Sequence, residues 1–415
     1  MKQVNLKTIC VLGLGHIGLP TALLLQNKEY SVVGVDVNEK TVNMINRGET
    51  PFTEPGLANL LKHKNITAKT KVENADVFII AVPTPLNRSL NVADLKYVKS
   101  ATDMIYPHLK RGNLVILEST VPPKTGENIV IPLLEKSGLK IGEFYFAHCP
   151  ERAIPGRTIY EMINNDRVIG GFDKTSTDLA HKVYSSFVLG EIHLVDMKTA
   201  EFIKLIENTY RDVNIALANE LAQIAEEFGI DVWEGIEIAN KHPRVNIHSP
   251  GPGVGGHCVA LDPWFLIENS TKGKIISMAR EINDSMPNYV LELLKTIIDP
   301  LTEDSTITIF GVAYKGDQSD IRESPAIKLI EMAHNLGIKI RCYDPYVEDF
   351  QFELFCLDEA VKDSDCIVVI ADHKCFKDIS PQKLGKMMRE KNLLDTRNIL
   401  CHEKWKEAGF KVKCL

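Results

Sequence analysis

The sequence predicts an α/β protein with two open, mainly parallel sheets joined by a long helix and a small helical segment. Short apolar runs alternate with helical periodicity near both ends of the chain. No glycine or proline interrupts residues 199–228, where apolar residues recur with helical spacing. Because 415 residues exceed one ordinary domain, we expect three regions. They are an N-terminal sheet domain (1–196), a central helical domain (197–299) and a C-terminal sheet domain (300–415).

The composition indicates a water-soluble globular protein. Apolar residues make up 44% and charged residues 25%, and the net charge of −7 gives no sign of nucleic-acid binding. The apolar runs are too short for a membrane span, and the chain opens directly on a strand, so we expect neither a membrane segment nor a signal peptide. Nine scattered cysteines without CxxC pairs favour reduced thiols in the cytoplasm, with no metal site.

The N-terminal region begins with a dinucleotide-binding pattern. An apolar strand at 8–12 runs into Gly-Leu-Gly-His-Ile-Gly (13–18), and a helix follows at 21–26. A second strand, at 30–35, ends in Asp36. The first glycine permits a tight turn, the second a close approach of backbone to a pyrophosphate, and the third close packing of helix on strand. Asp36 would bind ribose hydroxyls and repel a 2′-phosphate, which favours NAD over NADP. This half is therefore predicted to be Rossmann-like.

Two further strands of this half end in candidate site residues. The strand at 76–82 ends in Pro83-Thr84-Pro85, at the sheet edge where such folds bind ligands. The strand at 115–118 leads to Thr120, whose hydroxyl could face the cofactor or a water. An N-cap of a following helix is an equally good interpretation of Thr120.

The segment 145–152 also resembles a strand end. Glu151 follows a proline and could orient water; the alternative is a surface carboxylate paired with Arg152. His148 is expected to be a packed core histidine without a functional role.

The long helix carries Lys204 and Asn208 at i and i+4, on one face. Two such donors could stabilise an oxyanion, although a solvated lysine is the common alternative. Further along, Arg244 follows a proline and could bind a phosphate in bidentate fashion, or form a surface ion pair.

The glycine-rich stretch Gly251–Pro263 cannot be a regular helix or a central strand. Cys258 stands four residues before Asp262, so a helical turn there would put both on one face. A thiol beside a carboxylate suggests a nucleophile with a helper. The alternative is an inert cysteine in a loop.

The C-terminal region repeats the order of the first. We expect strands at 306–311, 338–343 (ending in Asp344), 365–370 and, as the last, 392–395, with a helix at 324–335. Since GxGxxG is absent, this sheet should bind something other than the dinucleotide's pyrophosphate. The cations Lys315, Arg322 and Arg397 follow its strands, where they suit a diphosphate. Arg322 could instead pair with Asp320 or Glu323.

With these pieces in order, the chain resembles the UDP-glucose/GDP-mannose dehydrogenase family over nearly its full length. The resemblance is carried by GLGHIGLP (13–20), VPTP (82–85), ESTVPPKTG (118–126), CPERAIPG (149–156), EFIKLIENTYRDVNIALANE (201–220), HPRVNI (242–247), GPGVGGHCVALDP (251–263) and KGDQSDIRESPA (315–326). Within the family, NDRVIGG (165–171) and the segments around 209–220 and 242–258 are similar to the branch that oxidises UDP-N-acetyl-D-mannosamine.

The resemblance implies a role for each matching residue. Cys258 would be the nucleophile, Lys204 and Asn208 would stabilise oxyanions, and Asp262, Glu151 and Thr120 would assist or position water. The NAD-binding set would be Gly13, Gly15, His16, Ile17, Gly18, Asp36, Pro83, Thr84, Thr120 and Arg322. The set that contacts a UDP-sugar would be Glu151, Arg152, Lys204, Asn208, Arg244, Gly255, Cys258, Lys315 and Arg397, with Arg244 reaching the partner subunit of a homodimer.

The resemblance also implies a reaction, an NAD-dependent four-electron oxidation at C6 through a thiohemiacetal and a thioester on Cys258. UDP-N-acetylglucosamine and UDP-glucose are competing substrates. Two competing functions are those of a two-electron β-hydroxyacid dehydrogenase and of a non-catalytic NAD-binding protein, and neither requires the cysteine.

Overall fold

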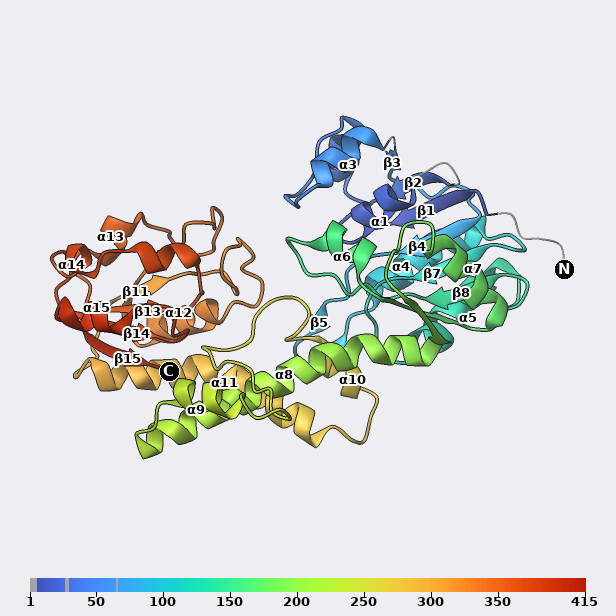
Figure 1. Ribbon diagram of the computed structural model, residues 1–415. Helices are drawn as coiled ribbons and strands as arrows, with labels where there is room; N and C mark the ends of the chain where they lie inside the picture. Colours follow the sequence, from blue (N-terminus) through green and yellow to red (C-terminus); the bar gives the residue numbers. More distant parts are fainter. Residues whose placement is uncertain (1–5, 27–29, 65) are drawn as a thin grey trace. The chain divides into compact units, whose positions relative to one another are not determined.

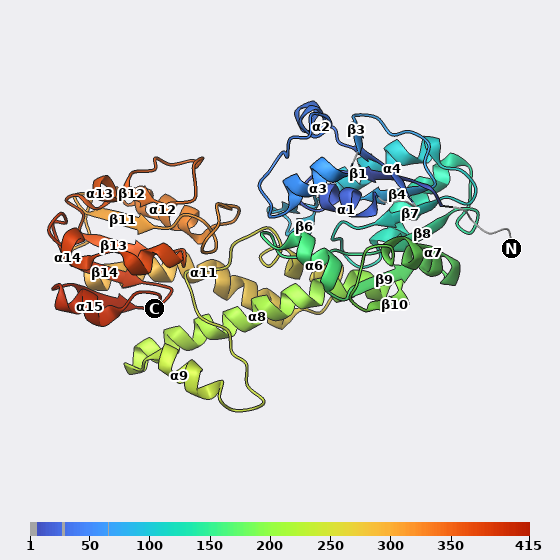
Figure 2. The same ribbon diagram turned by 45° about the horizontal axis from the view of Figure 1, so that its top comes forward.

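A computed structural model describes residues 6–26, 30–64 and 66–415 (Figure 1). Internal contacts divide it into two compact units. Unit 1 holds Met1–Glu207 and Trp264–Ser270, and unit 2 holds Asn208–Pro263 and Thr271–Leu415. One uninterrupted helix, α8 (Met197–Phe228), belongs to both, as Figure 2 also shows. The residues predicted as a helical domain are thus divided between the two units.

Unit 1 is built on an eight-stranded sheet of order β10-β9-β8-β7-β4-β1-β2-β3. All neighbouring strands pair in parallel except β8 and β9, which are antiparallel. Helices cover both faces, so the central strands are apolar on both sides. In β1, Cys10 and Leu12 pack into one core cluster, whereas Ile9 and Val11 pack into another on the opposite face. This double burial explains why the strand reads as a continuous apolar run.

Four strands predicted in unit 1, at 8–12, 30–35, 76–82 and 115–118, agree with the observed bounds to within two residues at either end, whereas the strands at 67–69, 167–171 and 192–196 were not predicted. The strands are β1 (Thr8–Leu12), β2 (Ser31–Val35), β3 (Thr67–Lys69), β4 (Val77–Ile80), β7 (Leu114–Leu117), β8 (Tyr145–His148), β9 (Arg167–Gly171) and β10 (Ile192–Asp196), with a hairpin of β5 (Leu86–Asn87) and β6 (Val92–Ala93). The helices are α1 (Gly18–Leu25), α2 (Glu39–Asn46), α3 (Leu57–His63), α4 (Lys96–Ile105), α5 (Ile131–Leu134), α6 (Thr158–Asn164) and α7 (Lys174–Tyr184), with short segments η1 (Tyr106–His108), η2 (Gly126–Val130) and η3 (Glu135–Ser137).

Unit 2 contains a five-stranded parallel sheet of order β12-β11-β13-β14-β15. Its strands are β11 (Thr306–Phe310), β12 (Lys339–Tyr343), β13 (Cys366–Val369), β14 (Asn392–Asp395) and β15 (Lys411–Cys414). The prediction that 392–395 is the last strand is wrong, because β15 follows and pairs with β14. This edge strand alternates lysine with apolar residues and therefore lacks the continuous apolar run of its neighbours.

Helices pack around this second sheet and around the C-terminal half of α8. They are α9 (Val232–Ala239), α11 (Lys274–Ile297), α12 (Pro325–Asn335), α13 (Leu357–Val361), α14 (Pro381–Leu384) and α15 (His402–Glu407), with η4 (Lys374–Asp378). The remaining helix, α10 (Asp262–Ile267), begins at the end of the glycine-rich stretch Gly251–Pro263, which we call the cysteine turn. The main cluster joins Ala222 of α8, Val290 of α11 and Ile307 of β11 in one core. The second half of α8 is thereby fixed to the sheet of unit 2.

The two sheets repeat the same first turn. Gly13 donates its backbone N–H to Val35 O at 2.8 Å, and Gly311 donates to Tyr343 O at 2.8 Å. Both glycines have positive φ, +89° and +84°. A Cβ on Gly13 would lie 2.5 Å from Ala81 O, and one on Gly311 would lie 2.5 Å from the Cβ of Ala371. Both turns therefore require glycine, because the backbone has a positive φ and because a Cβ would clash with the neighbouring loop.

We expect Gly311→Ala to lower thermal stability more than Gly409→Ala. Both substitutions place alanine at positive φ, which costs about 1–2 kcal/mol. Only position 311 adds a clash, since the nearest atom to a Cβ at 409 is Lys391 Nζ at 3.6 Å, and overpacking costs about 1–3 kcal/mol more. Thermal unfolding of both variants measures the difference. Equal decreases in melting temperature would contradict the claim that a Cβ at position 311 clashes with Ala371.

Candidate active site

The glycine fingerprint at the end of β1 leaves one position open. A Cβ on Gly18 would lie 1.8 Å from Gly13 O, so packing alone requires glycine there, as it does at Gly13. A Cβ on Gly15, in contrast, would meet no described atom within 4 Å. Packing therefore gives no reason for glycine at 15, whereas the approach of a pyrophosphate to the backbone does. The residues present fit a dinucleotide.

Asp36 follows β2 and is fixed by two backbone donors. Its carboxylate accepts the N–H of Leu14 at 2.8 Å and that of Asn38 at 2.8 Å. It is only half-buried, so oxygen lone pairs remain for ribose hydroxyls. His16, within the fingerprint itself, stacks on Phe52, with ring centroids 4.2 Å apart.

The remaining predicted cofactor residues of unit 1 lie at the same edge of the sheet. Ile17 precedes α1, and Pro83 and buried Thr84 follow β4. Ser119 holds this loop, because its Oγ donates to Val82 O at 2.7 Å and accepts the Val82 N–H at 2.9 Å. The sequence motif contained Ser119, but nothing in its pattern assigned it this contact.

Thr120 lies in a loop, and the N-cap alternative is wrong. The next helical segment, η2, starts only at Gly126. Glu201 of α8 holds the loop after Thr120 by accepting the N–H of Lys124 at 2.5 Å and that of Gly126 at 2.8 Å. Burial raises the pKa of Glu201 to about 7. Sequence reasoning missed this contact, since a glutamate on a helix has no local signal of burial.

Glu151 is buried, so the alternative of a surface carboxylate paired with the side chain of Arg152 is wrong. One carboxylate oxygen accepts the backbone N–H groups of Arg152 and Ala153, at 2.7 and 2.9 Å. The other lies 3.0 Å from the guanidinium of Arg167. The guanidinium of Arg152 turns away and pairs with Glu207 at 2.6 Å.

Arg167 is the centre of a buried charge cluster that sequence reasoning missed. It is 3% exposed and lies 2.5 Å from Glu118 as well as 3.0 Å from Glu151. Its Nε donates to Cys149 Sγ at 3.1 Å. Burial raises the pKa of Glu118 to about 7, although Arg167 opposes the shift. His148 nearby is fully buried, as expected, and burial lowers its pKa to about 3.

The helix α8 carries Lys204 and Asn208 one turn apart. Lys204 is half-buried, and Asn208 is buried. Asn208 donates from Nδ2 to the Asp262 carboxylate at 2.6 Å. Because only the NH2 group of an amide can donate to a carboxylate, this bond fixes which way the Asn208 amide faces. The second N–H and the oxygen then have fixed directions too.

Cys258 and Asp262 lie one helical turn apart, as the sequence spacing predicted. Asp262 donates its backbone N–H to Cys258 O at 2.9 Å, and α10 begins at Asp262. Cys258 is exposed, whereas Asp262 is 3% exposed. The thiol is therefore reachable while the adjacent carboxylate is fixed by Asn208.

The glycines of the turn allow it to pack closely against loops of unit 2. A Cβ on Gly251 would lie 2.7 Å from a guanidinium nitrogen of Arg397, and one on Gly255 would lie 2.6 Å from Glu323 O. Gly256 has φ +85° and donates its N–H to Arg322 O at 2.8 Å. The backbone contact at Gly255 and the positive φ of Gly256 both favour glycine over any residue with a Cβ.

Arg322 pairs with Asp320, which was the alternative interpretation of this arginine. Two guanidinium nitrogens donate to the carboxylate, at 2.9 and 2.6 Å. This hydrogen bond raises the pKa of Arg322, and electrostatic interactions with Asp320 and Cys258 act in the same direction.

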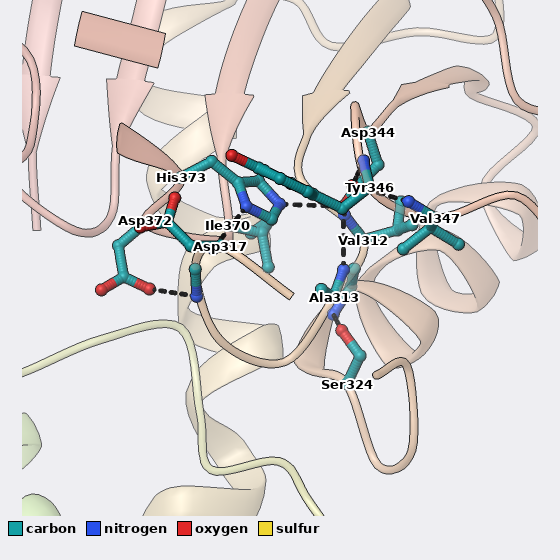
Figure 3. Close-up of polar contacts among 12 residues, drawn as sticks. Val312, Ala313, Asp317, Ser324, Asp344, Tyr346, Val347, Ile370, Asp372 and His373 are labelled. Carbon is teal, nitrogen blue, oxygen red and sulfur yellow. Dashed lines mark hydrogen bonds and ion pairs between the residues drawn. The ribbon is translucent and has the colours of Figure 1, made fainter. Parts of the chain in front are cut away.

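Lys315 is exposed on a loop that Figure 3 shows in detail. Asp344 accepts the N–H of Val312 at 2.7 Å, and Asp372 accepts that of Gly316 at 2.7 Å. His373 accepts the N–H of Asp317 at Nδ1, so its Nε2 carries the hydrogen donated to Asp344 at 3.0 Å.

Two further cations complete the predicted substrate set. Arg397 donates from Nε to Ile370 O at 2.7 Å, and burial lowers its pKa. Arg244 is exposed and contacts His242 at 3.4 Å. Among residues 6–26, 30–64 and 66–415 no ion pair of Arg244 is found, so its ion-pair alternative is not observed.

The described residues contain no cluster of histidine, cysteine or acidic side chains that could hold a metal ion. Within the same part of the chain, no helix has the length and apolar character needed to cross a membrane.

We expect Glu201→Gln to flatten the pH dependence of stability. Since burial raises the pKa of Glu201 from 4.5 to about 7, the folded state binds this proton more tightly than the unfolded state between those values. Raising the pH through this window therefore destabilises the native protein, by about 1–3 kcal/mol. Urea unfolding at pH 5 and pH 8 measures the change; Glu127→Gln is the exposed control. An unchanged pH dependence in Glu201→Gln would contradict the assignment.

Three family descriptions match consecutive parts of the chain. Residues 7–188 match the NAD binding domain of the UDP-glucose/GDP-mannose dehydrogenase family, 198–285 its central domain, and 308–402 its UDP binding domain. The first segment contains the glycine fingerprint, the second the cysteine turn, and the third most of the second sheet, although β15 lies beyond it.

Relatives match over almost the full length. A UDP-N-acetyl-D-mannosamine dehydrogenase of Methanococcus vannielii is 48% identical, covering 100% of this chain and 98% of its own. A second, from Methanocaldococcus jannaschii, is 50% identical, covering 99% and 96%. The solved structure of a UDP-D-ManNAc dehydrogenase from Pyrococcus horikoshii is 41% identical, with a TM-score of 0.92 and 98% of both chains covered. The chain therefore belongs to the UDP-glucose/GDP-mannose dehydrogenase family.

Proposed function

We propose that the protein oxidises UDP-N-acetyl-D-mannosamine at C6 to UDP-N-acetyl-D-mannosaminuronate, with two NAD+ and one water consumed. The observation that carries the substrate assignment is the run of full-length relatives named UDP-N-acetyl-D-mannosamine dehydrogenase, at 44% to 50% identity for those from archaea. The exposed thiol of Cys258 beside the Asn208–Asp262 pair supports the four-electron chemistry.

When bound at the glycine fingerprint beside Asp36, NAD+ would supply the hydride acceptor for both oxidations at C6. After the first, the Cys258 thiolate adds to the C6 aldehyde, and the carbonyl oxygen becomes the oxyanion of a thiohemiacetal. Loss of the second hydride converts this adduct into a thioester. Water then attacks the thioester carbonyl, the carbon–sulfur bond breaks, and the uronate leaves while Cys258 is regenerated. An aldehyde held covalently cannot escape between the two oxidations.

The oxyanion of each tetrahedral adduct requires hydrogen-bond donors. Asn208 supports this role, because its bond to Asp262 aims the rest of the amide, and Lys204 on the same helix face adds a positive charge. Asp262 lies one turn from the sulfur and can accept a proton from the thiol or from water. Glu151 and Thr120 are proposed to position the hydrolytic water.

The UDP-sugar is proposed to contact the cysteine turn and the cations around the second sheet. Gly255 offers backbone beside Tyr314, while Lys315 and Arg397 supply charges for the diphosphate. Arg152 would have to exchange its pair with Glu207 for the substrate. Arg322 is proposed to reach NAD, which likewise requires it to leave Asp320.

The proposed location is the cytoplasm, and the proposed product is a precursor of a polysaccharide. A reaction that uses NAD+ and a reduced thiol fits the cytoplasm. A nucleotide-linked uronic acid is an activated building block, so a glycosyl transfer into a polysaccharide is the class of reaction that would consume the product.

We expect two NADH per UDP-N-acetyl-D-mannosamine, measured by absorbance, with the acid detected by mass spectrometry. Cys258→Ser should release almost no uronate, because an oxygen ester forms and hydrolyses too slowly to support turnover. Cys356→Ser, at another exposed thiol, is the control and should turn over normally. Faster rates on UDP-N-acetylglucosamine or UDP-glucose would reassign the substrate. One NADH per substrate would favour a two-electron dehydrogenase, and no turnover a binding protein.

The proposed assembly is a homodimer. Five apolar side chains of α8 are between 38% and 54% exposed and fall on one face of the helix, namely Phe202, Ile206, Tyr210, Leu217 and Ile224. A continuous apolar face on a long helix is commonly buried against its symmetry mate. In such a dimer Arg244, which is exposed on a loop of the same region, is proposed to reach the partner's substrate.

Co-expression of Arg244→Ala and Cys258→Ala chains tests whether Arg244 acts on the substrate of the partner subunit. If Arg244 acts across the dimer, each mixed dimer has one complete site, so activity should return to about a quarter of the native value in a statistical mixture. Each variant expressed alone should stay nearly inactive. Mixed dimers that are no more active than Arg244→Ala alone would place Arg244 in its own subunit's site.

A further inference from the structure

We propose that Asn219 is a positioning residue that fixes the start of the cysteine turn, as Asn208 fixes its end. The inference rests on the proposed role of Cys258. Asn219 is fully buried on α8, eleven residues after Asn208. Its Oδ1 accepts the backbone N–H of Gly251, the first residue of the glycine-rich stretch, at 2.8 Å.

The two asparagines hold opposite ends of the turn. Asn208 binds Asp262 and Asn219 binds Gly251, so the segment runs antiparallel to α8 between them. Eleven residues of α-helix make about three full turns, so the asparagines share a face and lie roughly 16 Å apart along the axis. The same number of extended residues would span roughly 36 Å. The chain between the two anchors is therefore folded rather than extended, and Cys258 lies in its last turn, where the Cys258 carbonyl accepts the Asp262 N–H at 2.9 Å.

Asn219 is suited to this contact by having both a donor and an acceptor. A backbone N–H can only donate, so the oxygen of the amide must face Gly251. The Nδ2 group then faces the other way and donates to Asn283 Oδ1 at 2.9 Å. An aspartate could accept from Gly251 but could not donate to Asn283, and alanine could do neither.

A second layer of buried groups fixes Asn283 in turn. Its Nδ2 donates to the Asp212 carboxylate at 2.8 Å and to Asp212 O at 2.9 Å. Arg280, 1% exposed, lies 2.5 Å from Asp212 and 2.6 Å from Asp284. The relay thus runs from a charged pair through two amides to one backbone N–H of the cysteine turn, and α11 contributes half of it.

The anchor also bears on a proposed substrate contact. Gly251 lies so close to Arg397 that a Cβ would be 2.7 Å from its guanidinium. Movement of Gly251 away from Asn219 would therefore shift the turn relative to Arg397 as well as to α8. We expect loss of the anchor to lower kcat and to raise KM for the UDP-sugar, while KM for NAD stays unchanged.

The test compares Asn219→Ala and Asn219→Asp with Asp284→Asn as matched control. Asp284 belongs to the same relay at its exposed end but does not touch the turn. We expect Asn219→Ala to lower kcat 10- to 100-fold, because displacements near 1 Å cost that much. In Asn219→Ala the rate at which iodoacetamide labels Cys258 should change at least threefold. Peptide mass spectrometry measures this rate, with Cys356 as internal reference. Asp284→Asn should lower the melting temperature without changing Cys258 labelling.

Hydrogen–deuterium exchange on the native protein keeps the test independent of variants that do not fold. The Gly251 amide should exchange at least 100-fold more slowly than an unprotected amide. Fast exchange there, or Asn219→Ala and Asp284→Asn variants with equal labelling and equal kcat, would overturn the proposal. Labelling and exchange do not depend on turnover. They therefore still test the Asn219–Gly251 contact if Cys258→Ala remains active, a result that would refute the proposed function.

Discussion

The cysteine turn depends on hydrogen bonds supplied by other segments, because its glycines give it no regular structure of its own. Asn208 holds its last residues, the backbone oxygen of Arg322 holds Gly256, and Asn219 holds Gly251. Each bond contributes only about 1 kcal/mol net, but an unpaired buried partner costs about 1–3 kcal/mol. Breaking one of these hydrogen bonds therefore costs more free energy than forming it contributes. This cost holds the turn, and the exposed thiol of Cys258 on it, in one position.

The two sheets show how one turn can serve a ligand or the protein itself. Asp36 accepts two backbone N–H groups and is half-buried, which leaves lone pairs for a ribose. Its counterpart Asp344 is buried and accepts four backbone N–H groups as well as His373. A carboxylate offers about four lone-pair directions, so Asp344 has none left for a ribose. The second sheet uses its acid to fix the loop that carries Lys315 (Figure 3).

Local patterns predicted most of the fold, and the spacing of Cys258 and Asp262 predicted that they lie one helical turn apart. The glycine fingerprint, the long helix and the continuous apolar strands each follow from residues close in sequence, and the family resemblance added residue roles. What was missed depends on distant partners. Arg167 joins carboxylates that follow two other strands, and Asn219 reaches a glycine on a later loop; neither has a local signal. The edge strand β15 was missed because solvent on one side replaces its apolar run with alternating lysines. Arg322 pairs with Asp320, one of the alternatives that the sequence left open, and Arg152 pairs with Glu207; their ligand contacts stay predictions.

The central claim is that the sulfur of Cys258 holds the substrate covalently between two oxidations. Rapid quenching of the native enzyme during turnover with UDP-N-acetyl-D-mannosamine and NAD+, followed by intact-protein and peptide mass spectrometry, tests it most directly. We predict a transient mass increase equal to the acylated nucleotide sugar, located on the peptide that contains Cys258 and absent without NAD+. Steady turnover to the uronate with no adduct on that peptide at any time would contradict the account.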